Sequence, residues 1–283
     1  MRHCPRCGAE VDDGAVFCPS CGSYLGICPC CGTVVPKEQL SQTGLCPKCG
    51  QELRPVLVSK PAGGAKWRIS DVLKVLGVLV AVQVILAMLP SVGLSVALPW
   101  IVVYLFLSMS FVYLPLLALT VYYIRARGSR LNEIGISLAS PKHIVAGVLF
   151  GLTLMVVSAV VSILLSPFGL IPQQEGLTEI IRLPGVLPTL LLWVGVLAPI
   201  IEEIFFRGFS YCAFKSRWGK STATIASSLL FAVAHFDPMG IVQFTVLGVL
   251  LAYAYERTGS LPLVVLAHMV NNTVAIALAF LIV

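Results

Sequence analysis

Six polar residues within the apolar segments of the C-terminal half of the chain have types that suit hydrolytic chemistry. A charged or ionisable side chain inside a bilayer is costly, so it marks a functional site by default. A carboxylate beside a histidine can remove a proton from water. A neutral imidazole or a side-chain amide can donate hydrogen bonds to a developing oxyanion. The residues that could hydrolyse an amide bond in this way, without a serine or cysteine nucleophile, are Glu202, Glu203, Arg207, His235, His268 and Asn272.

Helical spacing predicts how these residues pair. Glu203 and Arg207 are four residues apart and can form an ion pair on one helix face. Glu202 points about 100° away from Glu203 around the same helix and is left without that partner. His268 and Asn272 are also one turn apart and share a face. We therefore predict that Glu202 is the acting carboxylate and that the ion pair supports it.

Depth in the membrane constrains the helix that carries the acids. At a rise of about 1.5 Å per residue, His235 lies about 21 Å from the membrane edge at Ser221. If the acidic helix runs over residues 187–214, Glu202 lies about 20 Å from its end, at a similar depth. An unpaired carboxylate is costly to bury, which favours an arrangement in which the polar groups meet. We predict one long helix over 187–214.

Composition indicates that most of the chain is embedded in a membrane. The 283 residues are 58% hydrophobic and 11% charged, with a mean hydropathy of +0.94. Soluble domains average about a quarter charged residues, and a disordered chain would be far less apolar. Residues 1–70 contain eight basic and five acidic residues and the remainder eleven and eight, so the net charge of +6 divides evenly. Neither part of the chain has a large excess of basic residues, which argues against nucleic acid as a partner.

Seven apolar segments approach the length of roughly 20 residues that a membrane-spanning helix needs. We predict an all-α polytopic membrane body over residues 70–283, with a motif-bearing core at 187–283. The basic residues that flank the segments fall almost entirely on one side if the chain crosses each time, which predicts a cytoplasmic N-terminus and an external C-terminus. The segments are 70–89, 98–124, 144–165, 187–214, 221–236, 239–255 and 261–282.

The first 50 residues repeat a Cys-Pro-x-Cys-Gly phrase four times. A C-x-x-C turn presents two thiolates to one tetrahedral ion, and the following glycine relieves the backbone as it turns back toward sulfur. We predict a double zinc ribbon over residues 1–50, with two structural zinc ions, and a linker over 51–69. Zinc thiolates persist in a reducing compartment, which also places this head in the cytoplasm. The two predicted sites are Cys4, Cys7, Cys18 and Cys21, and Cys28, Cys31, Cys46 and Cys49.

Three short motifs resemble those of the CPBP family, which contains CAAX prenyl endopeptidases and bacteriocin-processing proteins. Residues 202–208, EEIFFRG, resemble its EExxxR motif; residues 231–235, FAVAH, resemble FxxxH; and residues 268–272, HMVNN, resemble HxxxN. The likeness covers about residues 140–283. It does not include the head, which is similar to the double zinc ribbons of prokaryotic membrane proteins.

The resemblance implies a glutamate-dependent intramembrane endopeptidase with a cavity open to the cytoplasm and no metal in the catalytic site. By motif position, Glu202 and His235 would activate water, and His268 and Asn272 would hold the oxyanion. The implied substrate is a membrane-associated peptide or protein, prenylated or not, in the plasma membrane of a prokaryote. Supporting roles would fall to Glu203, Arg207 and Phe231.

Other functions could use the same residues. A non-catalytic membrane scaffold or immunity protein would use the head to bind a partner protein. A metal-dependent hydrolase would coordinate zinc through Glu202, His235 and His268. A proton-coupled transporter would also place acids and histidines in the membrane. In the head, a disulfide framework and a rubredoxin-like iron site are the alternatives to zinc.

Overall fold

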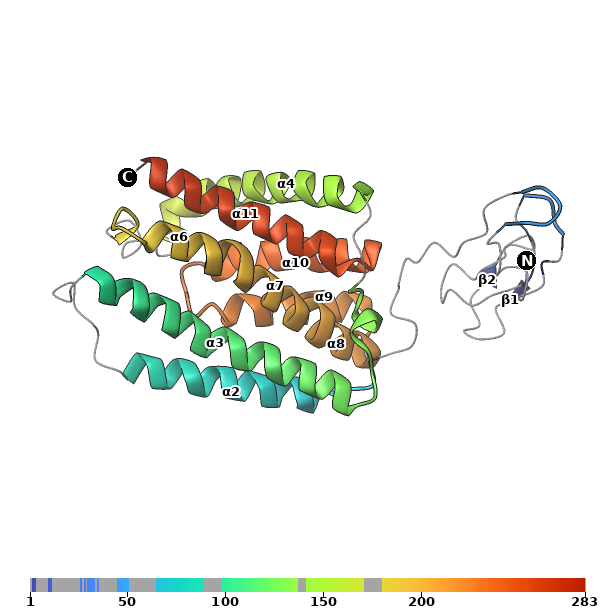
Figure 1. The fold of residues 1–283 in the computed structure, drawn as a ribbon, viewed down its shortest axis with the longest axis horizontal. Coiled ribbons are helices and arrows are strands. Elements are labelled where there is room, and N and C mark those ends of the chain that lie inside the picture. Colours follow the sequence, from blue (N-terminus) through green and yellow to red (C-terminus); the bar gives the residue numbers. More distant parts are fainter. Residues whose placement is uncertain are drawn as a thin grey trace. The chain divides into compact units, whose positions relative to one another are not determined.

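The chain forms two units, Met1–Gly63 and Gly64–Val283, in a computed structural model (Figure 1). The predicted zinc ligands Cys4, Cys7, Cys18 and Cys21 and most of the predicted linker lie outside the described residues. The structure describes residues 2–3, 10–11, 26, 28, 30–33, 35, 45–50, 65–88, 98–136, 141–170 and 180–282.

The described part of the first unit contains two cysteine turns with the same backbone geometry. Gly32 donates its N–H to the carbonyl of Cys28, and Gly50 donates to that of Cys46, both at 2.9 Å. Both glycines have a positive φ, 69° and 70°, which a residue with a Cβ adopts less readily. These are the glycines whose freedom the C-x-x-C turns require. The other described elements of this unit are the paired antiparallel strands β1 (Arg2–His3) and β2 (Glu10–Val11).

The described residues of the second unit form helices joined by turns, and each apolar segment predicted from the sequence is helical. In chain order the elements are α2 (Ile69–Met88), α3 (Leu98–Ala126), η1 (Leu131–Ile134), α4 (Pro141–Leu165), η2 (Ser166–Phe168), α6 (Val186–Leu190), η3 (Leu191–Leu197), α7 (Ala198–Glu203), η4 (Ile204–Tyr211), α8 (Cys212–Trp218), α9 (Lys220–Val233), α10 (Ile241–Thr258) and α11 (Leu261–Ile282). Figure 1 shows α2 beside α3 and α4 beside α11, and α9 packs on α10. The chain is therefore an all-α polytopic membrane protein with a zinc-ribbon head.

The helix predicted over 187–214 is one continuous helical run of 33 residues, Val186–Trp218. Figure 1 shows it as a single ribbon through α6, α7 and α8. Two π-helical stretches, η3 and η4, lie on either side of α7. A π-turn widens the helix and is frequent at functional sites, because it shifts side chains from their regular register. The two neighbouring acids stand at the end of α7, between these stretches.

Among the described residues, five helices are long and apolar enough to cross a membrane, whereas the sequence predicted seven spans. The predicted spans 221–236 and 239–255 are the helices α9 and α10, and neither is among the five. Helix α9 has 14 residues, or about 21 Å at the helical rise, against a hydrocarbon core about 30 Å thick. The five are Ile69–Leu86, Trp100–Ala126, Pro141–Phe168, Val186–Trp218 and Leu261–Ile282.

Two glycines bring α4 close to α11, which carries one of the site histidines. A Cβ on Gly147 would lie 3.1 Å from the carbonyl oxygen of Leu263. A Cβ on Gly151 would lie 2.6 Å from the carbonyl oxygen of Ala267 and 2.6 Å from the Cβ of Val270. Real Cβ atoms essentially never make contacts as short as those at Gly151, and most make longer ones than that at Gly147, so the helices approach closely because these positions have no side chain. The position of α11 therefore depends on the small residues of α4.

The buried core surrounds the middle of the long helical run. Phe205 and Phe209 are fully buried, and Phe206 is nearly so. Trp67, which falls in the predicted linker, is also buried: its ring stacks on Phe209, and its Nε1 donates to the Phe209 carbonyl at 2.8 Å. Asp71 is fully buried and accepts hydrogen bonds from the Arg127 side chain at 2.8 and 3.0 Å. These contacts fix the start of α2 against η4 and the end of α3.

Candidate active site

The Glu202 carboxylate is held at the midpoint of the long helical run. Sixteen residues of the run precede it and sixteen follow it. The hydroxyl of Tyr113, on α3, donates to Glu202 Oε1 at 2.7 Å. The Tyr113 ring in turn stacks on Trp193 of η3, with ring centroids 6.1 Å apart. One carboxylate oxygen thus has a fixed donor, while Oε2 faces away from that donor toward other partners.

Glu203 forms the ion pair that its spacing predicted, and it has a second partner. Its Oε1 accepts from Arg207 Nη1 at 2.9 Å and lies 2.9 Å from Nδ1 of His268. Glu203 and Arg207 are almost completely buried, at 0% and 1% exposure. The Arg207 guanidinium also lies 4.6 Å from the ring centroid of Phe231, where a cation–π attraction stabilises it. Glu203 and Arg207 therefore hold each other in place, and Glu203 also holds the His268 ring.

His268 lies between the two carboxylates. Its Nδ1 contacts Glu203 Oε1 at 2.9 Å, and its Nε2 lies 3.8 Å from Glu202 Oε2. A carboxylate can only accept a hydrogen bond, so Nδ1 carries a proton and donates it to Glu203. Glu203 thereby sets the orientation of the imidazole and directs Nε2 toward Glu202.

His235 follows α9 in a turn and is held by aromatic rings. Its Nδ1 lies 2.7 Å from the carbonyl oxygen of Phe231. Its ring stacks on Phe244 at 4.2 Å between centroids and meets Phe231 edge-on at 4.5 Å. Because a carbonyl only accepts, Nδ1 carries the proton, and Nε2 of the neutral ring has a free lone pair. The hydrogen bond to the Phe231 carbonyl therefore selects the tautomer of His235 whose Nε2 can act as a base.

Asn272 is tied to the long helical run. Its Nδ2 donates to the Val194 carbonyl at 3.0 Å, and its Oδ1 accepts from Asn271 at 3.1 Å. Val194 lies in the π-helical stretch η3, where the altered register leaves carbonyls free for side chains. Asn272 does not contact Glu202 or His268 in these hydrogen bonds. One N–H of its amide remains available, since a carboxamide has two.

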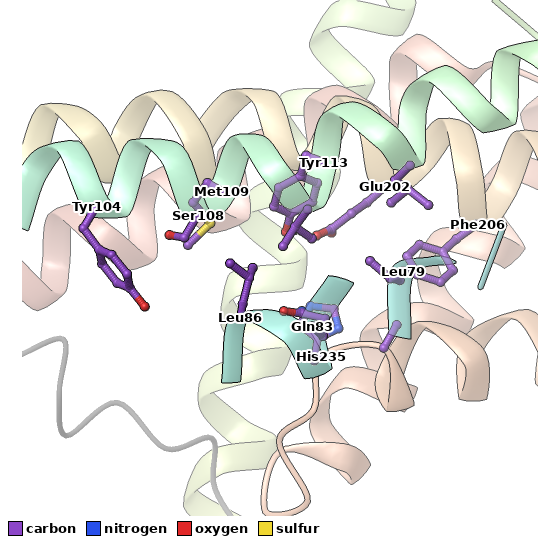
Figure 2. A pocket seen from close by; sticks show the side chains of 13 residues that line it. Leu79, Gln83, Leu86, Tyr104, Ser108, Met109, Tyr113, Glu202, Phe206 and His235 are labelled. Carbon is purple, nitrogen blue, oxygen red and sulfur yellow. The ribbon is translucent and has the colours of Figure 1, made fainter. Parts of the chain in front are cut away.

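A cavity of about 440 Å³ brings Glu202 and His235 to one surface. Figure 2 shows Tyr113 and Glu202 on one side of it and Gln83 and His235 on the other. His268 and Asn272 are not among its lining residues, although His268 lies directly behind Glu202. The lining residues are Leu79, Gln83, Leu86, Tyr104, Ser108, Met109, Val112, Tyr113, Leu116, Glu202, Phe206, Ala234 and His235.

Sequence reasoning missed Tyr113 and Gln83, both of which face this cavity. Tyr113 is one of eight tyrosines in the chain, and no spacing rule connects it with Glu202, which is 89 residues away. Gln83 did carry a signal, because it is a side-chain amide well inside an apolar segment predicted to span the membrane. Both residues come from helices that precede the three motifs.

In the head, four cysteines form a site suited to a tetrahedral metal. The sulfurs of Cys28, Cys31, Cys46 and Cys49 all lie within 4.8 Å of one another. Cys28 and Cys49 are 3.7 Å apart, and Cys31 and Cys46 are 3.5 Å apart. Sulfurs bound to one zinc at about 2.3 Å stand about 3.8 Å from each other in a tetrahedron. The described cysteines of the second predicted site therefore fit zinc, and they are free thiols, not disulfides.

The hydroxyl of Thr33 prepares one of these sulfurs for metal. It lies 3.3 Å from Cys31 Sγ. Hydrogen bonding to Thr33 lowers the pKa of Cys31 from 9.0 to about 6. The thiolate, not the thiol, is the metal ligand, so this lowering of the pKa favours the ligating form of Cys31.

Comparison with known proteins bears on both units. Residues 184–274 match the model of the type II CAAX prenyl endopeptidase Rce1-like family, and residues 3–25 match that of a zinc-ribbon domain. The family resemblance predicted from the three motifs is confirmed. The matched segment contains every residue of those motifs, whereas Tyr113 and Gln83 lie before it. The match at residues 3–25 includes the first two C-x-x-C turns.

Curated relatives from bacteria extend this likeness. The chain is 29% identical over 164 residues to the membrane-embedded CAAX protease MroQ of Staphylococcus aureus. It is 27% identical over 106 residues to YdiL of Bacillus subtilis, which is named as a proposed membrane peptidase. The matches cover 55% and 38% of this chain, and the chain spans 66% and 43% of the lengths of these relatives. No solved structure matches the chain significantly.

Proposed function

We propose that the protein is an intramembrane endopeptidase that hydrolyses a peptide bond of a membrane-associated substrate with water activated by Glu202 and His235. The observation that carries this proposal is the exposure of both side chains to one cavity halfway along a membrane-length helix. Burying an acid and a histidine at such a depth costs free energy, so their presence there marks a functional site. The family match over the same residues agrees with this chemistry.

In this proposal a water molecule between Glu202 and His235 loses a proton to one of them. Nε2 of His235 is available as acceptor, because Nδ1 donates to the Phe231 carbonyl. Glu202 Oε2 is available as well, because the Tyr113 hydroxyl binds Oε1. The water oxygen adds to the scissile carbonyl carbon and generates an oxyanion. The C–N bond then breaks, and the proton taken from water passes to the leaving amine.

His268 and Asn272 would stabilise the oxyanion. Since Nδ1 of His268 donates to Glu203, donation from Nε2 to an oxyanion requires an imidazolium with both nitrogens protonated. Asn272 would use the N–H that Val194 does not engage. Glu203 and Arg207 would act behind these residues by holding His268, and Phe231 by holding His235 through its carbonyl.

The substrate in this proposal is a membrane-associated peptide or protein, and the head serves a separate, structural role. The head would hold two zinc ions, one in each set of four cysteines, and bind a partner protein. We also propose the plasma membrane as the location, with the head in the cytoplasm. The zinc-thiolate chemistry expected of the four clustered cysteines, which suits a reducing compartment, and the basic residues in the loops support this orientation.

The proposal is tested by comparing membrane peptides from cells that carry either the wild-type protein or Glu202→Gln at matched abundance. Glutamine keeps the size of the side chain but cannot take up the proton. New C-termini that appear with the wild type and not with Glu202→Gln would identify the reaction and its substrate. Glu133→Gln removes an acid from η1, outside the cavity, and serves as the control that should match the wild type. Identical peptide profiles for all three forms would contradict the proposal.

A further inference from the structure

Gln83 is an uncharged polar residue deep in α2 whose side chain has no hydrogen-bond partner among the described residues. It lies fourteen residues after Ile69, where α2 begins, or about 21 Å along the helix. A carboxamide without a partner is costly in an apolar surrounding. The described side chains around α2 do not satisfy this amide, and the amide is open to the cavity, where a bound group can reach it.

The amide points into the same cavity as the proposed catalytic residues. Leu79, Gln83 and Leu86 are spaced by four and three residues and line the cavity as one face of α2. Figure 2 shows Gln83 across the cavity from Tyr113 and Glu202. A group bound to the amide would therefore lie beside the position where water is activated.

Apolar side chains make up about half of the residues that line this cavity. Six aliphatic or aromatic side chains from α2, α3 and the long helical run line the cavity together with Gln83, and they suit contact with the aliphatic side chains of a ligand. They are Leu79, Leu86, Met109, Val112, Leu116 and Phe206. A polar ligand without apolar groups would leave most of this surface without a complementary partner.

A carboxamide can donate and accept at once, as can a peptide group. We propose that Gln83 binds a backbone peptide group of the substrate next to the scissile bond, and that these apolar side chains receive an aliphatic side chain of the same segment. This inference rests on the proposed endopeptidase activity. Gln83 is thus a substrate-binding residue contributed by α2, outside the stretch that matches the family model.

The test uses the full-length protein in proteoliposomes and a library of internally quenched peptides that contain aliphatic residues around the cleavage position. Gln83→Leu removes the amide and replaces it with an apolar side chain, of a type that is common in α2. Losing one neutral hydrogen bond should raise KM about fivefold to tenfold and change kcat little. Val84→Leu introduces the same residue one position further, where the side chain is half exposed and does not line the cavity. It should behave as the wild type.

Replacing single peptide groups of a cleaved peptide by esters identifies the bonded group. For one position, the ester should weaken binding to the wild type several-fold and leave binding to Gln83→Leu unchanged, because that hydrogen bond is already absent. A purely structural role of Gln83 would not produce this coupling. Gln83→Met, closer in shape to glutamine, repeats the test if Gln83→Leu lowers the yield of folded protein.

The outcomes separate this inference from the proposed function. If the wild type cleaves no peptide, both the endopeptidase and the role of Gln83 are wrong. If the wild type cleaves and Gln83→Leu equals Val84→Leu in KM, the role of Gln83 alone is wrong. A loss in kcat at constant KM, or the same ester effect in wild type and Gln83→Leu, would also overturn it.

Discussion

A single hydroxyl from another helix orients the proposed catalytic carboxylate. Tyr113 donates to Glu202 Oε1 at 2.7 Å while its ring stacks on Trp193. Tyr113→Phe keeps the ring and removes the donor. A hydrogen bond to a charged group contributes about 1.5–3 kcal/mol, so kcat should fall roughly tenfold to a hundredfold. KM should change little, because the hydroxyl acts on Glu202 and not on the substrate.

Steady-state kinetics of the reconstituted protein measure this split. Tyr122→Phe is the matched control, since its side chain is 61% exposed on the same helix and does not line the cavity. It should retain the wild-type kcat. Equal kcat values for Tyr113→Phe and Tyr122→Phe would show that the hydroxyl does not position Glu202.

At the residue scale, the sequence predicted contacts within one helix better than contacts between helices. The four-residue spacing of Glu203 and Arg207 specified an ion pair that the structure contains. Nothing in the spacing predicted that His268 also contacts Glu203, or that Asn272 donates to Val194. Those contacts depend on how α11 packs against the long run, which local periodicity does not encode. The motif resemblance grouped the residues, and only the fold supplied their partners.

Among the elements, the packing of α4 on α11 sets where His268 stands. Gly151→Ala would place a Cβ 2.6 Å from a backbone carbonyl of α11 and 2.6 Å from Val270. Backbone cannot rotate away as a side chain can, so α11 must shift. We expect a destabilisation of about 1–3 kcal/mol, typical of overpacking, together with a loss of cleavage because His268 moves with α11. Thermal unfolding in detergent and the cleavage rate measure the two effects.

Gly77→Ala is the matched control for this substitution. Gly77 lies in α2, and a Cβ there would meet nothing within 4 Å. Alanine favours a helix over glycine by about 1 kcal/mol, so this variant should be as stable as the wild type or more so. If Gly151→Ala unfolds at the same temperature as Gly77→Ala, α4 and α11 are not held at this close distance.

Apolar length was a good guide to helices, since each predicted segment is helical, and five of the described helices are long and apolar enough to cross a membrane. The segments 221–236 and 239–255 are helical, yet α9 ends at Val233, and His235 lies in the turn beyond it. Gly240 is the N-cap of α10, a separate helix of 18 residues that is not among the five candidate spans. Likewise, the π-helical stretches around α7 could not be predicted, because their sequence is as apolar as that of a regular helix. The local helix type here depends on tertiary contacts.

For the whole molecule, the change from seven spans to five leaves the predicted orientation of the ends unaltered. If α9 and α10 form a hairpin that enters and leaves on one side, they remove two crossings together. The parity of crossings stays the same, so a cytoplasmic head still predicts an external C-terminus. With five spans that cross in turn, the basic loops are still predicted to share one side of the membrane.

The zinc content of the head can be measured on the full-length protein. We expect two zinc ions per full-length protein, measured by elemental analysis after purification without chelator. Cys31→Ser should remove one ion, because Cys31 is one of four sulfurs within 4.8 Å. Cys30→Ser is the control: Cys30 is the adjacent residue, is exposed and is not part of that group. A loss of zinc in both variants, or in neither, would contradict the assignment of this site.

Glu202 is proposed to drive the hydrolysis of a peptide bond within the membrane. The most direct measurement is the initial cleavage rate of an internally quenched peptide by purified full-length protein in proteoliposomes, for the wild type, Glu202→Gln and Glu133→Gln. General base catalysis contributes about a hundredfold to ten-thousandfold to a rate. The cleavage rate of Glu202→Gln should therefore fall at least about a hundredfold, while Glu133→Gln keeps the wild-type rate. Cleavage by Glu202→Gln at the wild-type rate would contradict this role of Glu202.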